Sequence, residues 1–378
     1  MKGFKKIYCS VFFILLVVTG YGQKETSYFQ ENFKDSTDNA FDISKWLSKV
    51  YGFFPLVSVV TEPAVGYGVS GGLIFIHQSM EESQKEGRPP SMSALGGLYT
   101  ENGTYGLGLF HKGYAKGDKY RYTTIGAYTN ANLSVYRNVP LIGNKEFKFN
   151  LEGVFFQGDF LFRLGKSRSF LGTQYVLTKF NVGFTTRVDE SDDLTQNVNI
   201  NLSGLGGMYD FDTRDNVFTP NKGMFFTSKF IVYNEAIGSN FDYTRFDNSL
   251  LLFTNKLSSI ILGLRTQYQV MLGDGPFIAN PFVGLRGIPV LRYQGKHVVL
   301  VETEERWDFA KRWSMVGFGG VGKAFNDNVA DDELAYSLGA GGRYLLARSF
   351  GLYTGIDVAR GPEDWAFYIQ FGHYWNRL

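Results

Sequence analysis

The stretch Tyr209-Asp-Phe-Asp-Thr-Arg-Asp-Asn-Val-Phe-Thr-Pro-Asn-Lys-Gly223 is the most informative part of this chain of 378 residues. Short polar side chains accept hydrogen bonds from turn amides, proline fixes φ, and glycine adopts conformations that other residues avoid. The residues of these kinds in the stretch are Asp212, Thr213, Arg214, Asp215, Pro220 and Gly223. They predict a tight turn that sets the register of the segments on either side, with a binding site as the lesser alternative. A calcium loop is excluded, because Arg214 and Asp215 stand where a ligand and a glycine are needed.

Segments of alternating polarity lie before and after this turn, and they are clearest in the last third of the chain. A period of two places each set of side chains on one face of a β-sheet. In residues 334–346 the apolar set is Leu334, Tyr336, Leu338, Ala340, Tyr344 and Leu346. The opposing set contains Arg343, and Asp357 holds the same place in the next segment.

The composition favours a membrane barrel over a soluble β protein. The chain has 35 Phe, 23 Tyr and 45 Gly, yet beyond residue 23 no apolar run approaches the length of a spanning helix. Outer-membrane barrels alternate lipid-facing and lumen-facing residues and carry aromatic residues at both interfaces. We therefore predict an all-β, transmembrane antiparallel β-barrel of the outer-membrane type, with a soluble all-β protein as the alternative. Arg343 facing lipid would cost about 2–4 kcal/mol near the midplane, so the polar set faces the lumen.

The alternation predicts about sixteen strands. They lie near 55–60, 65–77, 91–100, 104–113, 119–131, 145–164, 169–186, 196–211, 222–233, 243–255, 258–271, 296–306, 313–323, 334–346, 350–358 and 364–373. An even number lets a single chain close with both ends in the periplasm. Two points stay open: whether residues 55–77 form one strand or two, and whether a β-bulge or a strand break causes the change of phase after Phe155.

The N-terminus predicts export. Lys2, Lys5 and Lys6 precede the apolar run Val11–Val18, so residues 1–22 are expected to be a cleavable signal peptide, with a membrane helix as the alternative. Residues 23–54 are expected to form a short periplasmic segment with a small helix between Asp42 and Gly52, and residues 55–378 to form the barrel. Without the signal the chain keeps no cysteine and has a formal charge of −1. Nucleic-acid binding is not expected, because it requires an excess of positive charge.

A second short run, Gly284-Leu285-Arg286-Gly287, follows the turn after three predicted strands. Together the two runs resemble the BamA/TamA superfamily of outer-membrane barrels, also called bacterial surface antigen. The family has a D-T-R-D-N-x-F-x-P-x-x-G periplasmic turn and a V-R-G-Y/F run on a loop folded into the lumen. This chain departs from the second run with Leu285 for valine and Ile288 for the aromatic residue.

The resemblance implies roles for several residues. Arg286 would lie in the lumen and pair with acids on the next strand, where Glu302 and Glu304 share a face; Glu304 and Arg306 match the family's E-x-R run. A second acid usual on the following strand is replaced by Gly320, which implies a thinner network. A role for Arg286 in gating and a role in merely filling and stiffening the lumen are both open. Family barrels usually end on an aromatic assembly signal, and the residues expected to provide it are Phe371 and Trp375.

The resemblance implies a function in outer-membrane biogenesis, by insertion of protein or lipid, in a Gram-negative cell envelope. Its expected partners are outer-membrane lipid and other outer-membrane or periplasmic proteins, and no nucleic acid. Family members that handle polypeptides carry POTRA domains, and none is expected to fit in residues 23–54. A passive pore or a structural barrel is therefore the alternative.

No chemistry of a catalytic kind is expected. Two G-x-G-x-x-G runs, Gly66–Gly71 and Gly317–Gly322, lack the helix that a dinucleotide site needs. The four histidines show no ligand spacing and no Ser/His/Asp arrangement is legible, so we expect no enzyme, no metal and no cofactor. The acidic run Asp327–Glu333 is expected to be a solvated loop, with weak cation binding as the alternative.

Overall fold

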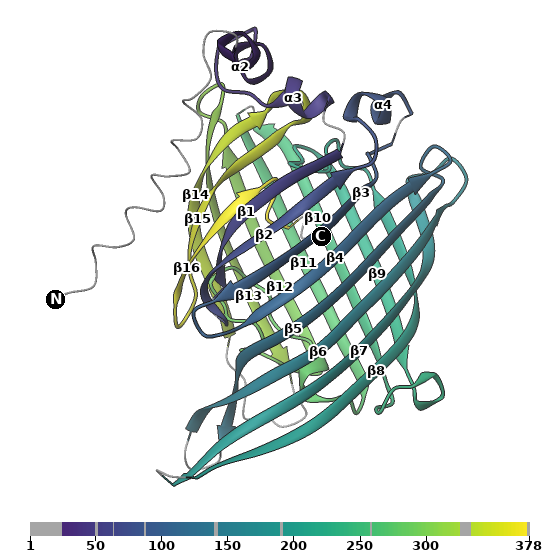
Figure 1. Cartoon of the computed structure of the whole chain (residues 1–378), viewed down its shortest axis with the longest axis vertical. Coiled ribbons are helices and arrows are strands. Elements are labelled where there is room, and N and C mark those ends of the chain that lie inside the picture. The colour runs from purple at the N-terminus through teal and green to yellow at the C-terminus, as the bar shows by residue number, and fades with distance from the viewer. Residues whose placement is uncertain are drawn as a thin grey trace, which may run out of the picture.

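The computed structural model describes residues 25–49, 52–62, 64–86, 88–139, 143–189, 192–257, 259–325 and 334–375. The expected signal peptide, Cys9 and the whole acidic run Asp327–Glu333 lie outside these residues. The described chain forms one antiparallel sheet of sixteen strands in sequence order, curled into a barrel (Figure 1). The strands are β1 Gly52–Glu62, β2 Gly66–Ile76, β3 Met92–Thr100, β4 Tyr105–Ala115, β5 Tyr120–Val139, β6 Gly143–Arg163, β7 Ser169–Asp189, β8 Asp192–Asp212, β9 Gly223–Tyr233, β10 Tyr243–Leu257, β11 Ile260–Gly273, β12 His297–Trp307, β13 Trp313–Phe325, β14 Leu334–Ala347, β15 Leu352–Arg360 and β16 Trp365–Phe371.

The number of strands agrees with the alternation of the sequence. Residues 52–76 form two strands, β1 and β2, and the amide of Val65 bonds to the carbonyl of Glu62 in the connection between them. On β14 the predicted outer residues Leu334 and Leu338 are 57% and 63% exposed, whereas Arg343 is buried. The apolar set therefore covers the outside of the barrel and the polar set lines its lumen, as predicted.

The expected bulge or break after Phe155 does not exist. Strand β6 pairs with β5 and β7 without a register shift. Phe149 and Leu151 are buried in the lumen, while Phe156 and Phe160 are on the outside. The apolar positions change phase because the wall itself changes polarity along the strand, not because the backbone is interrupted.

This change of polarity marks the part of β5–β8 that reaches beyond the other strands (Figure 1). Asparagines replace the apolar residues on the outer face there, and Asn150 donates to the side-chain oxygens of Asn130 and Asn132. The inner face is apolar and packs against the loop of residues 274–296. The buried side chains of this apolar core come from β6 to β11 and are Phe149, Leu151, Val176, Val182, Ile200, Leu202, Ile231, Tyr233, Tyr243 and Met271. An apolar core inside and polar side chains outside are what water around this end of the barrel requires.

Short helices cluster at the opposite end, which we call the helix-bearing end (Figure 1). They are α2 Glu25–Phe33, α3 Ser44–Lys49 and α4 Met80–Lys85. The chain also has three 3-10 turns in its connections, which are η1 Glu235–Ile237, η2 Phe277–Ala279 and η3 Arg348–Phe350. Asp42 accepts a hydrogen bond from the amide of Ser44 at the start of α3, and Gly52 opens β1 with a φ of 103°. No helix in the described ranges is long and apolar enough to cross a membrane.

Candidate functional site

The loop of residues 274–296, between β11 and β12, folds into the lumen. Its residues Val283, Leu285 and Ile288 are almost fully buried and pack on the inner faces of β12, β13 and β14. The hydroxyl of Ser337 on β14 donates to the carbonyl of Arg286 at 2.5 Å. We call residues 283–288 the lumen loop, and these contacts fix it against the wall.

Glycines on the wall make room for the lumen loop. A Cβ at Gly320 would lie 2.8 Å from the Leu285 side chain, and one at Gly322 would lie 2.5 Å from Val283. Gly287 has a φ of 80° and approaches the backbone of Gly361, whereas a Cβ at Gly284 would make only an ordinary contact, 3.9 Å from the Phe282 side chain. Gly320 therefore serves the loop by being small.

Arg286 is fully buried and binds three carboxylates. Its Nη2 and Nε atoms lie 2.9 and 3.1 Å from one oxygen of Glu302, and its Nη1 lies 2.7 Å from Glu304. The same Nη1 lies 3.0 Å from Asp357 on β15. Both acids expected from the sequence are present, and Asp357 is a third that the resemblance did not indicate. Three carboxylates therefore bind Arg286, and the third comes from β15 rather than from β13, where Gly320 stands.

Aromatic rings and further cations complete this network. The guanidinium carbon of Arg286 lies 3.4 Å from the ring centre of Phe318 and 4.5 Å from that of Tyr374. Arg265 pairs with Glu302 at 3.2 Å, and Arg343 pairs with Asp357 at 2.9 Å. Buried carboxylates without cations would be very unfavourable, so the site holds together only as a neutralised cluster.

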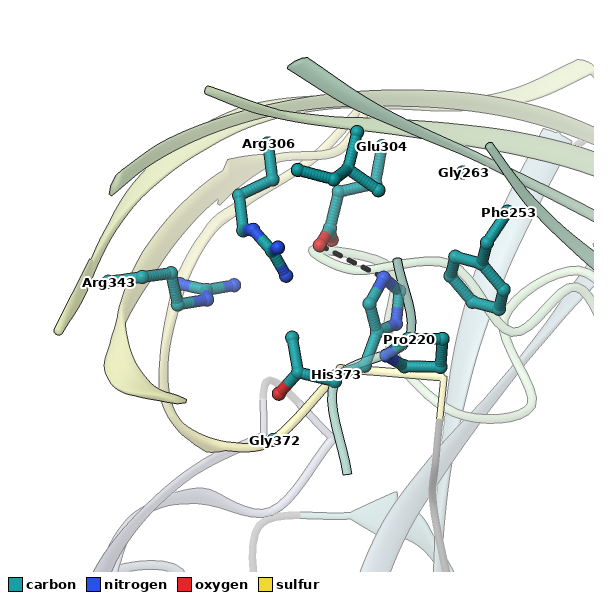
Figure 2. A pocket seen from close by; sticks show the side chains of 10 residues that line it. Pro220, Phe253, Gly263, Glu304, Arg306, Arg343, Gly372 and His373 are labelled. Carbon is teal, nitrogen blue, oxygen red and sulfur yellow. Dashed lines mark ion pairs between the residues drawn. The ribbon is translucent and has the colours of Figure 1, made fainter. Parts of the chain in front are cut away.

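Arg306, which with Glu304 matches the E-x-R run, makes its own contacts outside this cluster. It bonds to Asp308 at 2.9 Å and to the side-chain oxygen of Asn221 in the turn between β8 and β9. Residues 304 and 306 share a face, but Arg306 lies near the end of β12 and turns toward that end. The partner of Glu304 on this side is His373, with Nε2 3.2 Å away (Figure 2).

The C-terminal residues also enter the lumen. Strand β16 ends at Phe371, which is half-exposed, and Gly372 with a φ of 77° turns the chain inward. The indole of Trp375 is buried and donates to Glu302 at 2.8 Å. We call residues 372–375 the tail. Trp375 therefore does not end a strand, and only Phe371 stands where the expected C-terminal signal would be.

The turn of residues 212–223 has the structural character expected for it. The Asp212 carboxylate accepts from the amide of Arg214 and pairs with its guanidinium at 2.8 Å. Asp215 accepts from the amides of Asn221 and Lys222. A Cβ at Gly223, whose φ is 109°, would lie 2.4 Å from the carbonyl of Thr213, and the Thr213 hydroxyl accepts from the amide of Met224. Pro220 is buried.

This turn also joins the other features of the site. The carbonyl of Phe218 accepts from the amide of His373 at 2.7 Å, and the Asn216 amide group donates to the carbonyl of Phe350. A small pocket lies where the turn, the tail and β12 meet (Figure 2). Its lining includes Pro220, Phe253, Glu304, Arg306, Arg343 and His373. The two sequence motifs, far apart in the chain, thus meet around Glu304.

The first and last strands lie side by side, and we call their junction the seam. Within the described residues every strand is paired with the next from β1 to β16, but no ladder joins β16 to β1. Among the described residues the Thr61 hydroxyl donates to the carbonyl of Phe367 across the seam, and Tyr67 at the start of β2 stacks on Phe367 at 6.1 Å. The barrel is therefore least strongly bonded at this junction.

The remaining sequence candidates offer little chemistry. Both G-x-G-x-x-G runs lie on strands, β2 and β13. His77 and His111 come together on the outer wall, and each ring bonds to the hydroxyl of Ser93, at 2.7 and 2.8 Å. The backbone amides beside Ser93 in β3 are hydrogen-bonded within the sheet and cannot stabilise an oxyanion. The group of His77, Ser93 and His111 therefore lacks the donors that a nucleophilic site needs. Among the described residues no group of three or more potential ligands could hold a metal ion.

Comparison with known proteins identifies the fold. No family model matches the chain, and no curated protein does. Among solved structures, BamA from Haemophilus ducreyi lacking POTRA domains 1–3 matches with a TM-score of 0.58 and 11% identity, over 92% of this chain and 78% of that one. The chain has the fold of an outer-membrane β-barrel.

Other outer-membrane proteins match this barrel with lower scores. Wzi of Escherichia coli, a carbohydrate-binding barrel of capsule assembly, has a TM-score of 0.36 and 9% identity over 85% of this chain and 84% of that one. OccK10 of Pseudomonas aeruginosa has a TM-score of 0.33 and 10% identity over 84% and 96%.

Proposed function

We propose that this barrel is a component of outer-membrane biogenesis, related to the BamA/TamA proteins, that inserts protein or lipid through the seam between β1 and β16. The observation that carries the proposal is the absence of a backbone ladder between these two strands in the described residues. An unpaired strand edge presents a row of N–H and C=O groups that can pair with an incoming strand. A passive porin-like barrel does not require an unpaired strand edge.

The sequence of β1 suits an edge strand. Pro55 lies within it, opposite Leu73 of β2, and proline cannot donate a hydrogen bond. Prolines inside sheets are confined to edges, where the missing donor faces the unpaired side. Strand β16 has seven residues against eleven in β1, so part of the β1 edge has no neighbour of matching length.

The buried network restrains one side of the seam more than the other. The amide of Gly287 donates to the Tyr368 hydroxyl on β16, and Arg286 binds Asp357 on β15. The tail that continues β16 is bonded to Glu302 and Glu304. Strand β1 has no comparable link to the lumen loop among the described contacts. Opening by movement of β1 would therefore leave the Arg286 network intact.

A passive pore or structural barrel is the second candidate, and charged side chains of β5 and β6 near the β4–β5 turn favour it. Asp118 forms a bidentate pair with Arg121 at 2.6 Å and also binds Arg163. Such charged walls are typical of water-filled barrels. This candidate requires no movement of the seam.

Photo-crosslinking tests the proposal. A crosslinking residue at Val57, 78% exposed on β1, should capture folding outer-membrane proteins or lipid in living cells. The control is Leu107, 65% exposed on β4 and away from the seam. Equal capture at the two positions would contradict a role for the β1 edge.

A further inference from the structure

Residues 29–46 carry four aromatic side chains that stack on one another at the helix-bearing end. Phe33 lies 5.3 Å from Phe29, 6.1 Å from Phe41 and 6.0 Å from Trp46, measured between ring centres. We call these four residues the aromatic patch. Phe29 and Phe41 are 49% and 44% exposed, although they are among the most apolar side chains of the segment. Exposed aromatic clusters of this kind mark contact surfaces.

The aromatic patch continues the lipid-facing surface of the barrel. The Tyr344 hydroxyl on the outer face of β14 donates to the carbonyl of Phe41 at 2.6 Å. The Tyr344 ring packs edge-on against Trp313 of β13, with ring centres 4.9 Å apart, and Trp313 is 54% exposed. Beside them the rings of Trp307 and Phe309 lie 5.7 Å apart in a tilted arrangement, and both side chains are about half exposed. These rings form the aromatic band that outer-membrane barrels place at the membrane interface.

The segment is held at this position by an ionic clamp. Arg312, in the connection between β12 and β13, binds Asp35, Asp38 and Asp42 at 2.5 to 2.7 Å. The amide of Ile43 also bonds to the carbonyl of Leu346 in β14. The polar side of the segment is thus fastened to the barrel end.

Apolar side chains of α3 and of the residue before it also hold the segment on the barrel. Ile43 and Leu47 pack against Phe350 and Ala347 at the mouth of the barrel. Phe29 and Phe41 take no part in this packing, and about half of each side chain is exposed. Their exposed faces are therefore available to another surface.

We propose that residues 25–49 form an interfacial anchor, in which the aromatic patch inserts into the headgroup region of the membrane leaflet at the helix-bearing end. The occupant is phospholipid. Aromatic side chains favour this depth, where one side of the ring meets hydrocarbon and the other meets water. The anchor would fix the barrel end relative to the bilayer, whatever the barrel transports or inserts.

Fluorescence quenching tests the anchor. Cys9 is the only cysteine of the chain, so the Cys9→Ser protein accepts single labels. Phe29→Cys and Phe41→Cys are each labelled with bimane, and the barrel is reconstituted in vesicles of phosphatidylethanolamine and phosphatidylglycerol. Some of the lipid carries a spin-label quencher, either near the headgroup or at the end of the acyl chain. Both labels should lose fluorescence, and more strongly with the headgroup quencher.

Two matched positions calibrate the result. Ser36→Cys is exposed on the same segment outside the patch and should keep its fluorescence. Leu338→Cys, 63% exposed on the outer face of β14, should be quenched most by the acyl-chain label. Heat-modifiable migration on gels verifies that each variant is folded.

The proposal is overturned if the labels at residues 29 and 41 are quenched no more than the label at residue 36. It is also overturned if they stay bright in vesicles but are protected from a thiol reagent in the intact envelope, because a protein would then cover the patch.

Discussion

Replacing Arg286 by alanine is the sharpest test of the lumen network. The change leaves Glu302, Glu304 and Asp357 close together and removes the cation that all three share. Breaking a buried ion pair by removing one partner typically costs about 3–5 kcal/mol, because a buried charge is left uncompensated.

The structure places the expected loss of unfolding free energy near the lower end of that range. Each carboxylate keeps another partner: Glu302 keeps Arg265 and the Trp375 indole, Glu304 keeps His373, and Asp357 keeps Arg343. We therefore expect Arg286→Ala to lower the free energy of unfolding by about 3 kcal/mol.

Urea unfolding in lipid vesicles, followed by tryptophan fluorescence, measures this loss. Arg292→Ala is the control, because Arg292 lies in the same loop of residues 274–296 and pairs at 2.9 Å with Glu363, which is one-third exposed. Pairs of this exposure contribute about 0–1 kcal/mol.

A second change tests the pairing itself. Adding Glu304→Gln to Arg286→Ala should recover about 1 kcal/mol, because one of the unpaired negative charges is removed. The reasoning is refuted if Arg286→Ala costs no more than Arg292→Ala, or if the two changes at 286 and 304 are simply additive.

Three further predictions follow from other parts of the molecule. A cysteine at Asn221 should be labelled only when the periplasm is accessible, whereas one at Asp331, outside the described residues, should react from outside the cell; the reverse pattern would overturn the topology. The side-chain hydrogen bond from Arg312 holds the pKa of Asp38 at about 2 instead of 3.8, so its contribution is present above pH 4 and is lost as the pH falls toward 2. Proteolysis should accordingly release residues 25–49 in acid, and at neutral pH in Arg312→Ala; equal resistance of the two proteins at neutral pH would contradict the clamp. Trp375→Ala removes a buried ring and its bond to Glu302, and should lower the free energy of unfolding in urea by about 3–5 kcal/mol; an unchanged midpoint would show that the tail is not docked.

Most of the barrel could be predicted from the sequence, because lipid imposes a strict period of two on every strand that it touches. Where water replaces lipid, that constraint disappears. Strand β6 shows this, since its Phe149 faces the lumen and its Phe156 faces outward without any irregularity in the backbone. A prediction based on apolar residues alone therefore interprets the change from lipid to water as an irregularity of the backbone.

The lumen network was predictable only in part. Glu302 and Glu304 follow Arg286 closely in sequence and share one face of a strand, so the resemblance indicates them. Asp357 lies 71 residues from Arg286 and meets it because the barrel curves back on itself. The inward turn of the tail depends on the conformation of Gly372, which composition cannot distinguish from that of a strand glycine.

A disulfide across the seam tests the proposed function most directly. Thr61 and Phe367 are in contact, so the Thr61→Cys/Phe367→Cys protein should form a bond that locks β1 to β16. The control is Val59→Cys/Val69→Cys, which links facing residues of β1 and β2 and leaves the seam free. Growth and envelope integrity are compared in strains that depend on each protein, with and without a reducing agent. The proposal predicts failure of the seam-locked strain alone and its rescue by reduction. Normal growth and an intact envelope with the seam locked would contradict it and favour a passive or structural barrel.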